Sequence, residues 1–259
     1  IHTVSNFRIV KGTDESYYQT NQKGTESALQ VAQVCRVKRF IHTSTIGVHG
    51  NVKQTPAKEE SPLNPGDLYQ STKLLAENAC KAVAAQGKME VVVVRPTSQY
   101  GPGDLRMLKM FRMIQNQRFL LIGRCRENFH AVYIDDLVRA YQCILKTPDL
   151  NGHVFFIGGE RYLSLQEYID SAARALGVKK PGLRVPYWPV HFAGWLCELI
   201  CKPLGVEPPL HRRRVKFFKN NRAFDISRAE RVLGYVPQVD LDEGMRRTVK
   251  WYRAQGLLD

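Results

Sequence analysis

Two side chains with catalytic potential, Tyr69 and Lys73, stand four positions apart in the stretch Asp67-Leu-Tyr-Gln-Ser-Thr-Lys-Leu-Leu-Ala-Glu77. Good helix formers follow Lys73, and on a helix residues four positions apart share one face. An ammonium beside a phenol favours the phenolate, so the pair predicts a general acid/base that works near neutral pH. The spacing alone also fits an ordinary surface helix, so the surrounding elements must decide between the two interpretations.

Two strands are expected to bring polar groups close to this helix. Residues 89–94, Met-Glu-Val-Val-Val-Val, form a strand that is apolar apart from Glu90, typical of a parallel strand covered on both faces, and lead into Arg95-Pro-Thr-Ser98. Residues 38–44 form a short strand that ends in the hydroxyl cluster Thr43-Ser44-Thr45. Strands alternate with helices along the chain, which predicts a doubly wound α/β fold with a parallel sheet. In such folds ligands bind at the carboxyl edge of the sheet.

The remaining elements continue this alternation up to about residue 160 and then become mostly helical, which we interpret as a smaller lobe. Expected helices span 14–34, 105–115, 137–145, 164–176, 190–202, 227–233 and 242–254, and expected strands are 153–157 and the end of a strand at 1–5. Asp135-Asp136 and either Ser227 or Asp225 are expected as helix caps. Gly24 inside the first helix suggests close packing or ligand approach.

The charge balance is strongly basic. The 259 residues carry a net charge of +14 with a pI of about 9.6, which favours anionic partners without naming one. The densest basic run, His211-Arg-Arg-Arg-Val-Lys216, fits a solvated surface better than an anion site. The six cysteines show no metal-binding spacing, nor do His2, His42 and His130, so no metal and reduced cytoplasmic thiols are expected.

An aromatic-rich stretch from Pro186 to Ile200 leaves two interpretations open. It fits an amphipathic helix on a membrane surface, because a basic run follows it. It also fits a helix that packs the substrate lobe, which we favour. No apolar run in the chain is long enough to span a bilayer.

Six groups of residues occur in an order that is typical of one protein family. They are Asn21-Gln-Lys-Gly-Thr25, Thr43-Ser-Thr-Ile-Gly-Val-His-Gly50, Tyr69-x-x-x-Lys73 with Glu77, Arg95-Pro96 with Tyr100-Gly-Pro-Gly-Asp104, Tyr133-Ile-Asp-Asp136, and Phe224-Asp-Ile-Ser-Arg-Ala229 with Leu233-Gly-Tyr-Val-Pro237. Together they resemble the extended short-chain dehydrogenases/reductases of the NAD-dependent epimerase/dehydratase family. The resemblance implies a Rossmann-like sheet lacking its first strands, with the dinucleotide-binding domain at 1–104 and 129–160 and a mostly helical substrate lobe at 105–128 and 161–259.

The resemblance also implies roles for individual residues. Tyr69 would be the proton acid/base for alcohol–ketone interconversion, Lys73 would lower its pKa and hold the nicotinamide ribose, and Thr45 would hydrogen-bond the substrate oxygen. The implied cofactor contacts are Asn21, Thr43, Tyr69, Lys73, Pro96 and Thr97. The implied substrate contacts are Thr45, Tyr69, Ser98, Phe129 and His130. For Asn21, a backbone brace inside the sheet is the alternative.

One departure from the family pattern concerns the cofactor, NAD or NADP. The Gly-rich turn that cradles its pyrophosphate does not follow a first strand in these residues, and Ile1-His-Thr-Val-Ser5 resembles the family's fourth strand. We therefore expect the phosphate-binding loop upstream of Ile1, in a longer protein.

A second departure concerns the substrate. Phe129-His-Ala131 stands where nucleotide-sugar members of the family carry Arg-Asp-Phe, and His49 stands where they carry a tyrosine. These changes favour a less charged ring, as in steroid-dehydrogenase-like and flavonol-reductase-like members. The basic residues Arg212 to Lys216 would restore anion binding, so a sugar and a steroid-like ring both stay open.

Two classes of function remain. An oxidoreductase or epimerase explains why Thr45, Tyr69 and Lys73 occur together. A non-catalytic nucleotide-binding or regulatory protein of the same fold would explain the net charge of +14 and the missing phosphate loop. We favour the enzyme, with a small-molecule substrate and a homodimer formed through the catalytic-helix face, and we expect no nucleic-acid partner.

Overall fold

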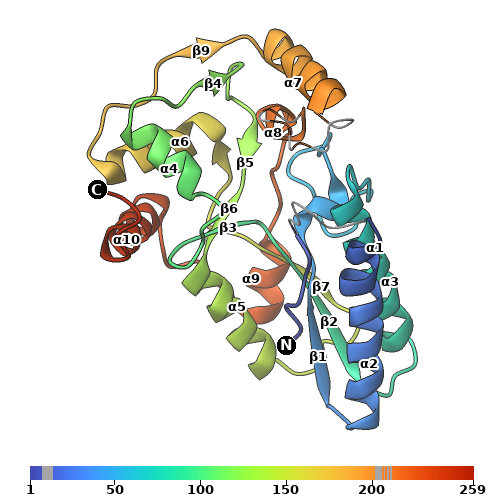
Figure 1. Cartoon of the computed structure of the whole chain (residues 1–259). Helices are drawn as coiled ribbons and strands as arrows, with labels where there is room; N and C mark the ends of the chain where they lie inside the picture. The colour runs from blue at the N-terminus through green and yellow to red at the C-terminus, as the bar shows by residue number, and fades with distance from the viewer. Residues whose placement is uncertain (8–13, 202–205, 207, 209, 211) are drawn as a thin grey trace. The chain divides into compact units, whose positions relative to one another are not determined.

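The structure, a computed structural model, describes residues 1–7, 14–201, 206, 208, 210 and 212–259 (Figure 1). The chain divides into two compact units, and each is described on its own. Unit 1 comprises Ile1–Thr97, Asp135–Gly158 and Phe224–Pro237, and unit 2 comprises Ser98–Ile134, Gly159–Ala223 and Gln238–Asp259. The domain boundaries implied by the family resemblance stay a prediction.

A parallel sheet lies at the centre of unit 1, in the order β1-β2-β7. Its strands are β1 (Arg39–Thr43), β2 (Glu90–Pro96) and β7 (Val154–Ile157). Val91 to Pro96 are all buried, as expected for an apolar strand covered on both faces. Because neighbouring strands run parallel, their carboxyl ends lie at one edge of the sheet, as the sequence predicts.

Helices cover both faces of this sheet: α2 and α3 lie along one face and α5 and α9 along the other (Figure 1). The helical elements of this part of the chain are α1 (Asp14–Tyr17), η1 (Tyr18–Lys23), α2 (Gly24–Val34), η2 (Ile46–His49), α3 (Leu68–Ala84), α5 (Ile134–Lys146) and α9 (Ser227–Leu233). The core between the sheet and the helices α2 and α3 is formed by Leu29, Phe40, Cys80, Val91 and Val93. The buried apolar stripe of α3 explains why it docks on β2.

The first expected helix contains a π-helical turn. Residues 14–34 are helical throughout, but Tyr18–Lys23 is a π-helix, a local widening often found at functional sites. Gly24 follows this turn. A Cβ at Gly24 would meet only the carbonyl oxygen of Gln19, at 3.5 Å, so close packing against another described segment does not explain the glycine.

Three expectations differ at the ends of elements. The expected strand end at 1–5 is reduced to a parallel bridge between His2 and His42. Helix α5 begins at Ile134, so Asp135 and Asp136 lie in its first turn rather than at the cap. The helix dipole stabilises carboxylates at this end of a helix. The N-cap of α9 is Ile226, which makes no side-chain cap hydrogen bond, so neither Ser227 nor Asp225 is the cap. The Asp225 carboxylate accepts a hydrogen bond from the backbone N–H of Ser227, the first residue of the helix.

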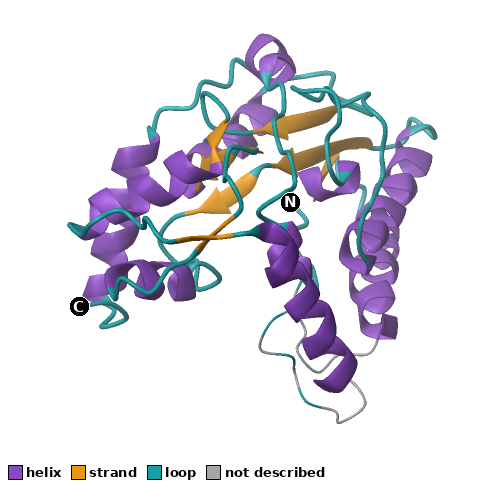
Figure 2. Ribbon diagram, turned by 90° about the horizontal axis from the view of Figure 1, so that it is seen from above, coloured by secondary structure: helices purple, strands orange, loops and turns teal. Residues whose placement is uncertain are grey.

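Unit 2 is built from short strands and longer helices, drawn in orange and purple in Figure 2. Its elements are β3 (Ser98–Tyr100), α4 (Leu108–Gln115), β4 (Leu121–Ile122), β5 (Asn128–Phe129), β6 (Ala131–Tyr133), β8 (Leu163–Ser164), α6 (Leu165–Leu176), β9 (Arg184–Val185), α7 (Tyr187–Cys201), α8 (Arg212–Lys216) and α10 (Leu241–Ala254). Phe111, Tyr168 and Tyr252 are fully buried in a core that α4, α6 and α10 share. Of the helices that the structure describes, none has the length and apolar character to cross a membrane.

Candidate active site

The helix that carries Tyr69 and Lys73 begins beside the ends of β1 and β2. The Asp67 carboxylate caps α3 by accepting a hydrogen bond from the backbone N–H of Gln70, at 2.9 Å. Lys73 and Glu77 follow Tyr69 at intervals of four residues and so lie on the same side of the helix. Both are buried, whereas Tyr69 is half-buried, so this side runs from the surface into the interior of unit 1.

Lys73 is the most unusual of these side chains, because its ammonium group is enclosed. Its side chain is 1% exposed, and Nζ donates a hydrogen bond to the carbonyl oxygen of Thr43, at 2.7 Å. His42 Nε2 lies 3.3 Å from the same nitrogen. Burial lowers the pKa of Lys73 to about 8, while the nearby Glu77 carboxylate acts in the opposite direction. The side chain is therefore still mostly charged at pH 7 but releases its proton more readily than a free lysine.

His42 completes this enclosure from β1. Burial, and then the charge of Lys73, hold the pKa of His42 well below its usual value, so its imidazole is neutral at pH 7. His42 Nδ1 is buried without a hydrogen-bond partner among the described residues. The ring of His2 stacks on it with a centroid separation of 5.7 Å.

Tyr69 reaches the surface above Lys73. The Phe7 ring meets the Tyr69 ring edge-on, with centroids 4.7 Å apart, and this contact restricts where the phenol can point. The backbone carbonyl of Tyr69 accepts a hydrogen bond from Thr72 Oγ1, at 2.9 Å. A phenol one helical turn before a buried lysine is an arrangement that can accept and donate a proton.

The two threonines at the end of β1 differ in how their hydroxyls are used. Thr45 Oγ1 accepts a hydrogen bond from Gly47 N, at 3.0 Å, and caps η2, so its own hydroxyl hydrogen is still available as a donor. Thr43 Oγ1 lies 2.6 Å from the Tyr141 hydroxyl of α5. Burial raises the pKa of Tyr141 to about 12, so this partner is a neutral phenol. The backbone of Thr43, through its carbonyl, holds Lys73.

Thr97, which directly follows Pro96 at the end of β2, carries an unused polar group. Its backbone N–H donates to the carbonyl oxygen of Ile157, at 2.8 Å, which fixes the chain beside β7. The side chain is buried, and Oγ1 has no hydrogen-bond partner among the residues that the structure describes. A buried hydroxyl without a partner costs free energy unless a ligand or water provides one.

Asn21 uses its amide inside the protein. Its Oδ1 accepts a hydrogen bond from Asn6 N at 2.6 Å, and Nδ2 donates to Asn6 O and to Thr72 Oγ1, both at 3.0 Å. These bonds tie the π-helical turn to Asn6, near the start of the chain, and to Thr72 on α3. They correspond to the brace that the sequence left as an alternative, and the cofactor role of Asn21 stays a prediction.

Sequence reasoning missed a buried ionic network directly below this site. Arg95 and Glu77, 1% and 0% exposed, form a salt bridge of 2.6 Å between Nη2 and Oε2. Ser44 Oγ also donates to the Glu77 carboxylate. A buried charge needs such a partner because desolvation is costly. The signal was present in the sequence: a single arginine ends an otherwise apolar buried strand and so requires an acidic partner.

His49 belongs to the same network rather than to the surface of a pocket. Arg95 Nη1 donates to His49 Nε2 at 2.9 Å, which leaves the proton on Nδ1, and Nδ1 donates to the carbonyl oxygen of Pro62 at 3.2 Å. Burial, together with the charge of Arg95, lowers the pKa of His49 to about 4. The residue that replaces the family's tyrosine is therefore neutral and has a structural role.

The predicted substrate residues Ser98, Phe129 and His130 lie in unit 2. Phe129 is buried, and its ring centroid lies 4.6 Å from that of Tyr168. His130 is also buried, and its Nε2 donates to the carbonyl oxygen of Gly159, at 2.8 Å. Ser98 is half-buried and donates its backbone N–H to the carbonyl oxygen of His130, at 2.9 Å. Their substrate roles stay a prediction.

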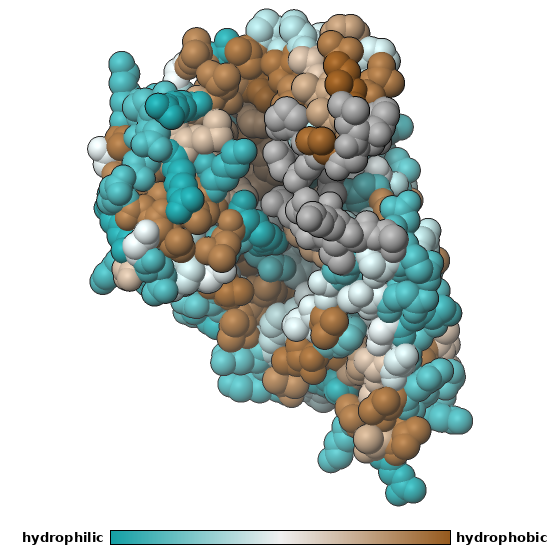
Figure 3. All heavy atoms as spheres, viewed as in Figure 1, coloured by the Kyte–Doolittle hydropathy of each residue, from teal (hydrophilic) through white to brown (hydrophobic). Residues whose placement is uncertain are grey.

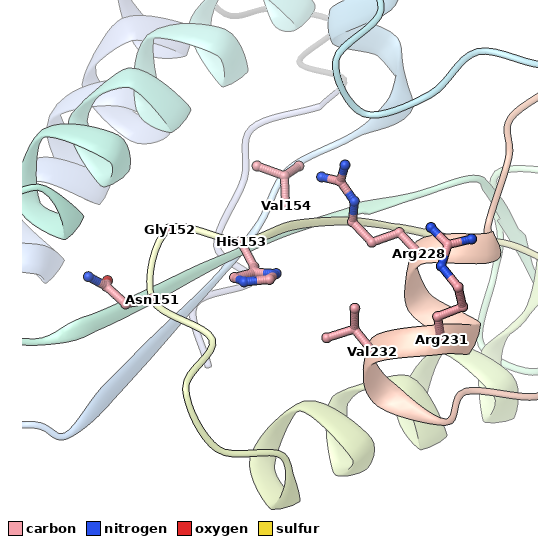
Figure 4. Close-up of a pocket in the computed structure, with 7 residues that line it drawn as sticks. All are labelled: Asn151, Gly152, His153, Val154, Arg228, Arg231 and Val232. Atoms are coloured by element: carbon pink, nitrogen blue, oxygen red, sulfur yellow. The ribbon is translucent and has the colours of Figure 1, made fainter.

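A separate pocket of about 430 Å³ lies in unit 1, at the start of β7 (Figure 4). It is lined by Asn151, Gly152, His153, Val154, Arg228, Arg231 and Val232. Since β7 runs parallel to β2, the pocket lies at the edge of the sheet opposite to Thr97. The Arg228 guanidinium is bound by the carboxylates of Glu59 and Glu60. Neither here nor elsewhere in the described chain do three His, Cys, Asp or Glu side chains gather as metal ligands would.

Sequence relatives agree with the expected family. A profile of the NAD dependent epimerase/dehydratase family matches residues 4–158. The decarboxylating sterol-4-alpha-carboxylate 3-dehydrogenase of Schizosaccharomyces pombe is 31% identical over 252 residues, which cover 91% of this chain and 72% of that protein. The 3beta-hydroxysteroid-dehydrogenase/decarboxylase isoform 1 of Arabidopsis thaliana is 29% identical over 255 residues, which cover 90% of this chain. The chain spans 57% of the length of isoform 1 and 44% of isoform 2.

Solved structures share the fold. The UDP-glucuronic acid 4-epimerase of Bacillus cereus, in complex with NAD, has a TM-score of 0.77 at 21% identity. The match covers 98% of this chain and 74% of the epimerase chain. The dTDP-glucose 4,6-dehydratase of Streptomyces venezuelae has a TM-score of 0.75 at 24% identity. These matches confirm the predicted α/β class with a Rossmann-like parallel sheet. With the profile match and the relatives, they show that the chain belongs to the NAD-dependent epimerase/dehydratase family.

Proposed function

We propose that the protein is an NAD(P)-dependent oxidoreductase or epimerase that interconverts a secondary alcohol and a ketone on a ring substrate. One observation carries this proposal: a half-buried Tyr69 stands above an enclosed Lys73 on one helix, beside the carboxyl ends of β1 and β2. Family membership supports it. A second support is the position of the pair, because folds of this kind bind ligands at the carboxyl edge of the sheet.

In the proposed reaction Tyr69 accepts the hydroxyl proton of the alcohol, or returns it to the ketone. The Lys73 ammonium favours the phenolate, because an opposite charge stabilises the anion. The Thr45 hydroxyl, which donates to none of the described residues, donates a hydrogen bond to the substrate oxygen. The nicotinamide cofactor, when bound, carries the hydride.

Two residues, Lys73 on α3 and Thr97 at the end of β2, fit the nicotinamide end of such a cofactor. An ammonium has three donors. Lys73 uses one on the Thr43 carbonyl and directs a second toward His42, which leaves a third for a ribose hydroxyl. The buried Thr97 hydroxyl, which has no partner in the described chain, fits a polar atom of the nicotinamide ribose or amide. NAD and NADP are both compatible with these contacts.

For the substrate, we propose a steroid-like or other weakly charged ring in preference to a nucleotide sugar. Several sequence relatives are named as dehydrogenases of sterols or hydroxysteroids, at 27–31% identity. Phe129 and His130, at the positions where nucleotide-sugar members carry Arg-Asp, support this preference. A panel of sterols, simple cyclic alcohols and nucleotide sugars, assayed with both cofactors, distinguishes the classes.

The proposal extends to a cytoplasmic homodimer formed through the outer face of α3. Leu75, on the first half of this helix, is 37% exposed although it is a large apolar residue. Light scattering of the full chain measures the mass directly. A monomer at every concentration would contradict the dimer and leave the catalytic proposal intact.

The catalytic proposal is tested with the full chain and a Tyr69→Phe variant. Turnover, followed by nicotinamide absorbance, is expected to fall by about 10²- to 10⁴-fold, the usual effect of a general acid/base. Cofactor affinity, measured by fluorescence titration, should change little. Tyr18→Phe, which alters another partly exposed tyrosine of unit 1, is the matched control and should keep full activity. Full turnover by Tyr69→Phe would contradict the mechanism, and cofactor binding without any turnover would favour a regulatory protein.

A further inference from the structure

Helix α7 presents an apolar face that the other described segments leave largely exposed. Every exposed residue of this helix is apolar, and the largest are Trp188, Phe192, Trp195, Leu196, Leu199 and Ile200, which we call the α7 face. Trp188 and Phe192 are 68% and 62% exposed. In Figure 3 the brown, hydrophobic surface gathers at the top, where Figure 1 places α7. A helix of a globular protein normally turns such a stripe toward the core.

The polar residues of α7 point the other way. Glu198 is only 12% exposed, and its carboxylate binds Arg212 through Nε and through the backbone N–H, both at 2.9 Å. His191 stacks on Tyr187, with ring centroids 5.5 Å apart. The two side chains His191 and Glu198 are therefore half-buried, like Val190 and Cys197, whereas the exposed side of the helix carries apolar side chains only. No charged group of α7 lies among its exposed residues.

The stretch of sequence that contains α7 is strongly basic. Residues 179–223 contain ten lysines and arginines but only two glutamates, a net charge of +8 out of +14 for the chain. Lys219 Nζ lies 4.7 Å from the ring centroid of Trp188 and 4.9 Å from that of Tyr187, so cation–π contacts hold an ammonium beside the α7 face. Lys216 is exposed on the neighbouring helix α8. Tryptophan, phenylalanine and leucine flanked by lysine and arginine are typical of helices that lie in a membrane interface.

We propose that the α7 face docks the protein on a lipid bilayer that contains anionic headgroups. With 15 residues, α7 is about 22 Å long, too short to cross a hydrocarbon core of about 30 Å, so it lies in the plane of the interface. The tryptophans then sit at headgroup depth while Lys219 reaches the phosphates. A second copy of the chain fits this surface less well. A symmetric contact would bring two stretches of net charge +8 together, and like charges repel.

Vesicle flotation with the full chain tests the proposal. The protein is expected to float with vesicles of phosphatidylcholine mixed with phosphatidylglycerol, to bind pure phosphatidylcholine more weakly, and to dissociate as salt is raised. Tryptophan emission should shift to the blue and be quenched by brominated lipid. A Trp251→Phe background restricts this signal to Trp188 and Trp195, since the chain has three tryptophans.

Two variants test the apolar and the charged parts separately. Phe192→Ser combined with Leu199→Ser is expected to weaken vesicle binding at least tenfold. Lys219→Gln is expected to weaken it about fivefold on anionic vesicles only, the usual effect of one cation near such a surface. The matched control is Val31→Ser combined with Val34→Ser, which removes equally exposed apolar side chains from α2 and should bind like the wild type.

Failure of the wild type to float with either vesicle would overturn the proposal, as would normal binding by the Phe192→Ser, Leu199→Ser variant. A dimer that dissociates with the same variant, without vesicle binding, would assign the face to a second copy instead. Unfolding midpoints of all variants, measured in urea, distinguish loss of docking from loss of fold. These outcomes do not depend on catalytic activity.

Discussion

Helices α3 and α7 have similar lengths, 17 and 15 residues, and break the usual burial pattern in opposite directions. Helix α3 buries a lysine and a glutamate, Lys73 and Glu77, whereas α7 exposes large aromatic residues such as Trp188 and Phe192. The buried charges of α3 have partners within unit 1, while the apolar groups of α7 stay largely exposed, with only local contacts such as that of Trp188 with Lys219. The difference indicates that α3 is completed by its own protein, apart from a small ligand, and that α7 requires a large external surface.

This comparison has energetic consequences. Burying an unpaired charge costs several kcal/mol, so changes at α3 should affect both folding and chemistry. An exposed apolar side chain contributes little to folding, so changes at α7 should affect only docking.

The largest effect is expected from Lys73→Met. Removing the ammonium takes away the charge that favours the Tyr69 phenolate and the donors for the cofactor, so turnover should fall at least 100-fold. Stability should change far less. The site raises the free energy of the charged form by about 3 kcal/mol, because burial moves its pKa from 10.5 to about 8, and this offsets the lost hydrogen bond to Thr43. Nicotinamide absorbance and urea unfolding measure the two effects.

A pH series and a control complete this test. Between pH 8 and 10.5 the unfolded wild type binds more protons at this lysine than the folded protein does, so stability contributed by Lys73 rises with pH across that window. Lys73→Met should lose this slope. Lys81→Met, at an exposed position of the same helix, should keep both the slope and the activity. A large loss of stability in Lys73→Met at pH 7 would contradict the expectation that the cost of burying the charge offsets the hydrogen bond to Thr43.

The second effect in size is expected from Glu77→Ala, which leaves Arg95 charged and buried without its carboxylate. Breaking a buried pair in this way costs about 3–5 kcal/mol in the free energy of unfolding. The double variant Glu77→Leu, Arg95→Met should recover part of that loss, because no unpaired charge remains. Arg161→Ala breaks an exposed pair with Glu167 and should cost less than about 1 kcal/mol. Equal losses in the two single variants, measured in urea, would contradict the difference between buried and exposed pairs.

Much of α3 and its surroundings could be predicted from the sequence, because local rules decide it. The valine run of β2 predicts a buried parallel strand, and the spacing of Tyr69 and Lys73 predicts a shared helix face. The pairing of Glu77 with Arg95 could not be placed in this way, since the two residues are 18 positions apart and meet only when α3 docks on β2.

The orientation of α7 was harder to predict for a different reason. Its sequence is apolar almost all round, so periodicity does not identify which side faces the protein. The structure decides it through Arg212, which holds Glu198 on the inner side. The sequence favoured a helix that packs unit 2, and the exposed tryptophans and phenylalanine instead support the membrane-surface alternative.

A moderate effect is expected from acidification, through His49. Because burial lowers its pKa from 6.5 to about 4, the unfolded state binds more protons in that window, and stability falls as pH decreases through it. Between pH 7 and pH 5 this group alone should remove about 2 kcal/mol. His49→Gln retains an acceptor for Arg95 but does not titrate, so the fall should be smaller. Urea unfolding at the two pH values measures it, and an undiminished fall would assign the effect to other groups such as His42.

The smallest effect on stability is expected from Phe192→Ser, although it removes a whole aromatic ring. The side chain is 62% exposed, so its loss should change the free energy of unfolding by no more than about 0.5 kcal/mol. Phe111→Ala, in the core of the same unit, should cost about 3–5 kcal/mol, because the ring is fully buried and leaves a cavity. Urea unfolding of both variants tests the contrast. A loss at Phe192 comparable to that at Phe111 would mean that the α7 face is covered within the folded protein and is not available for docking.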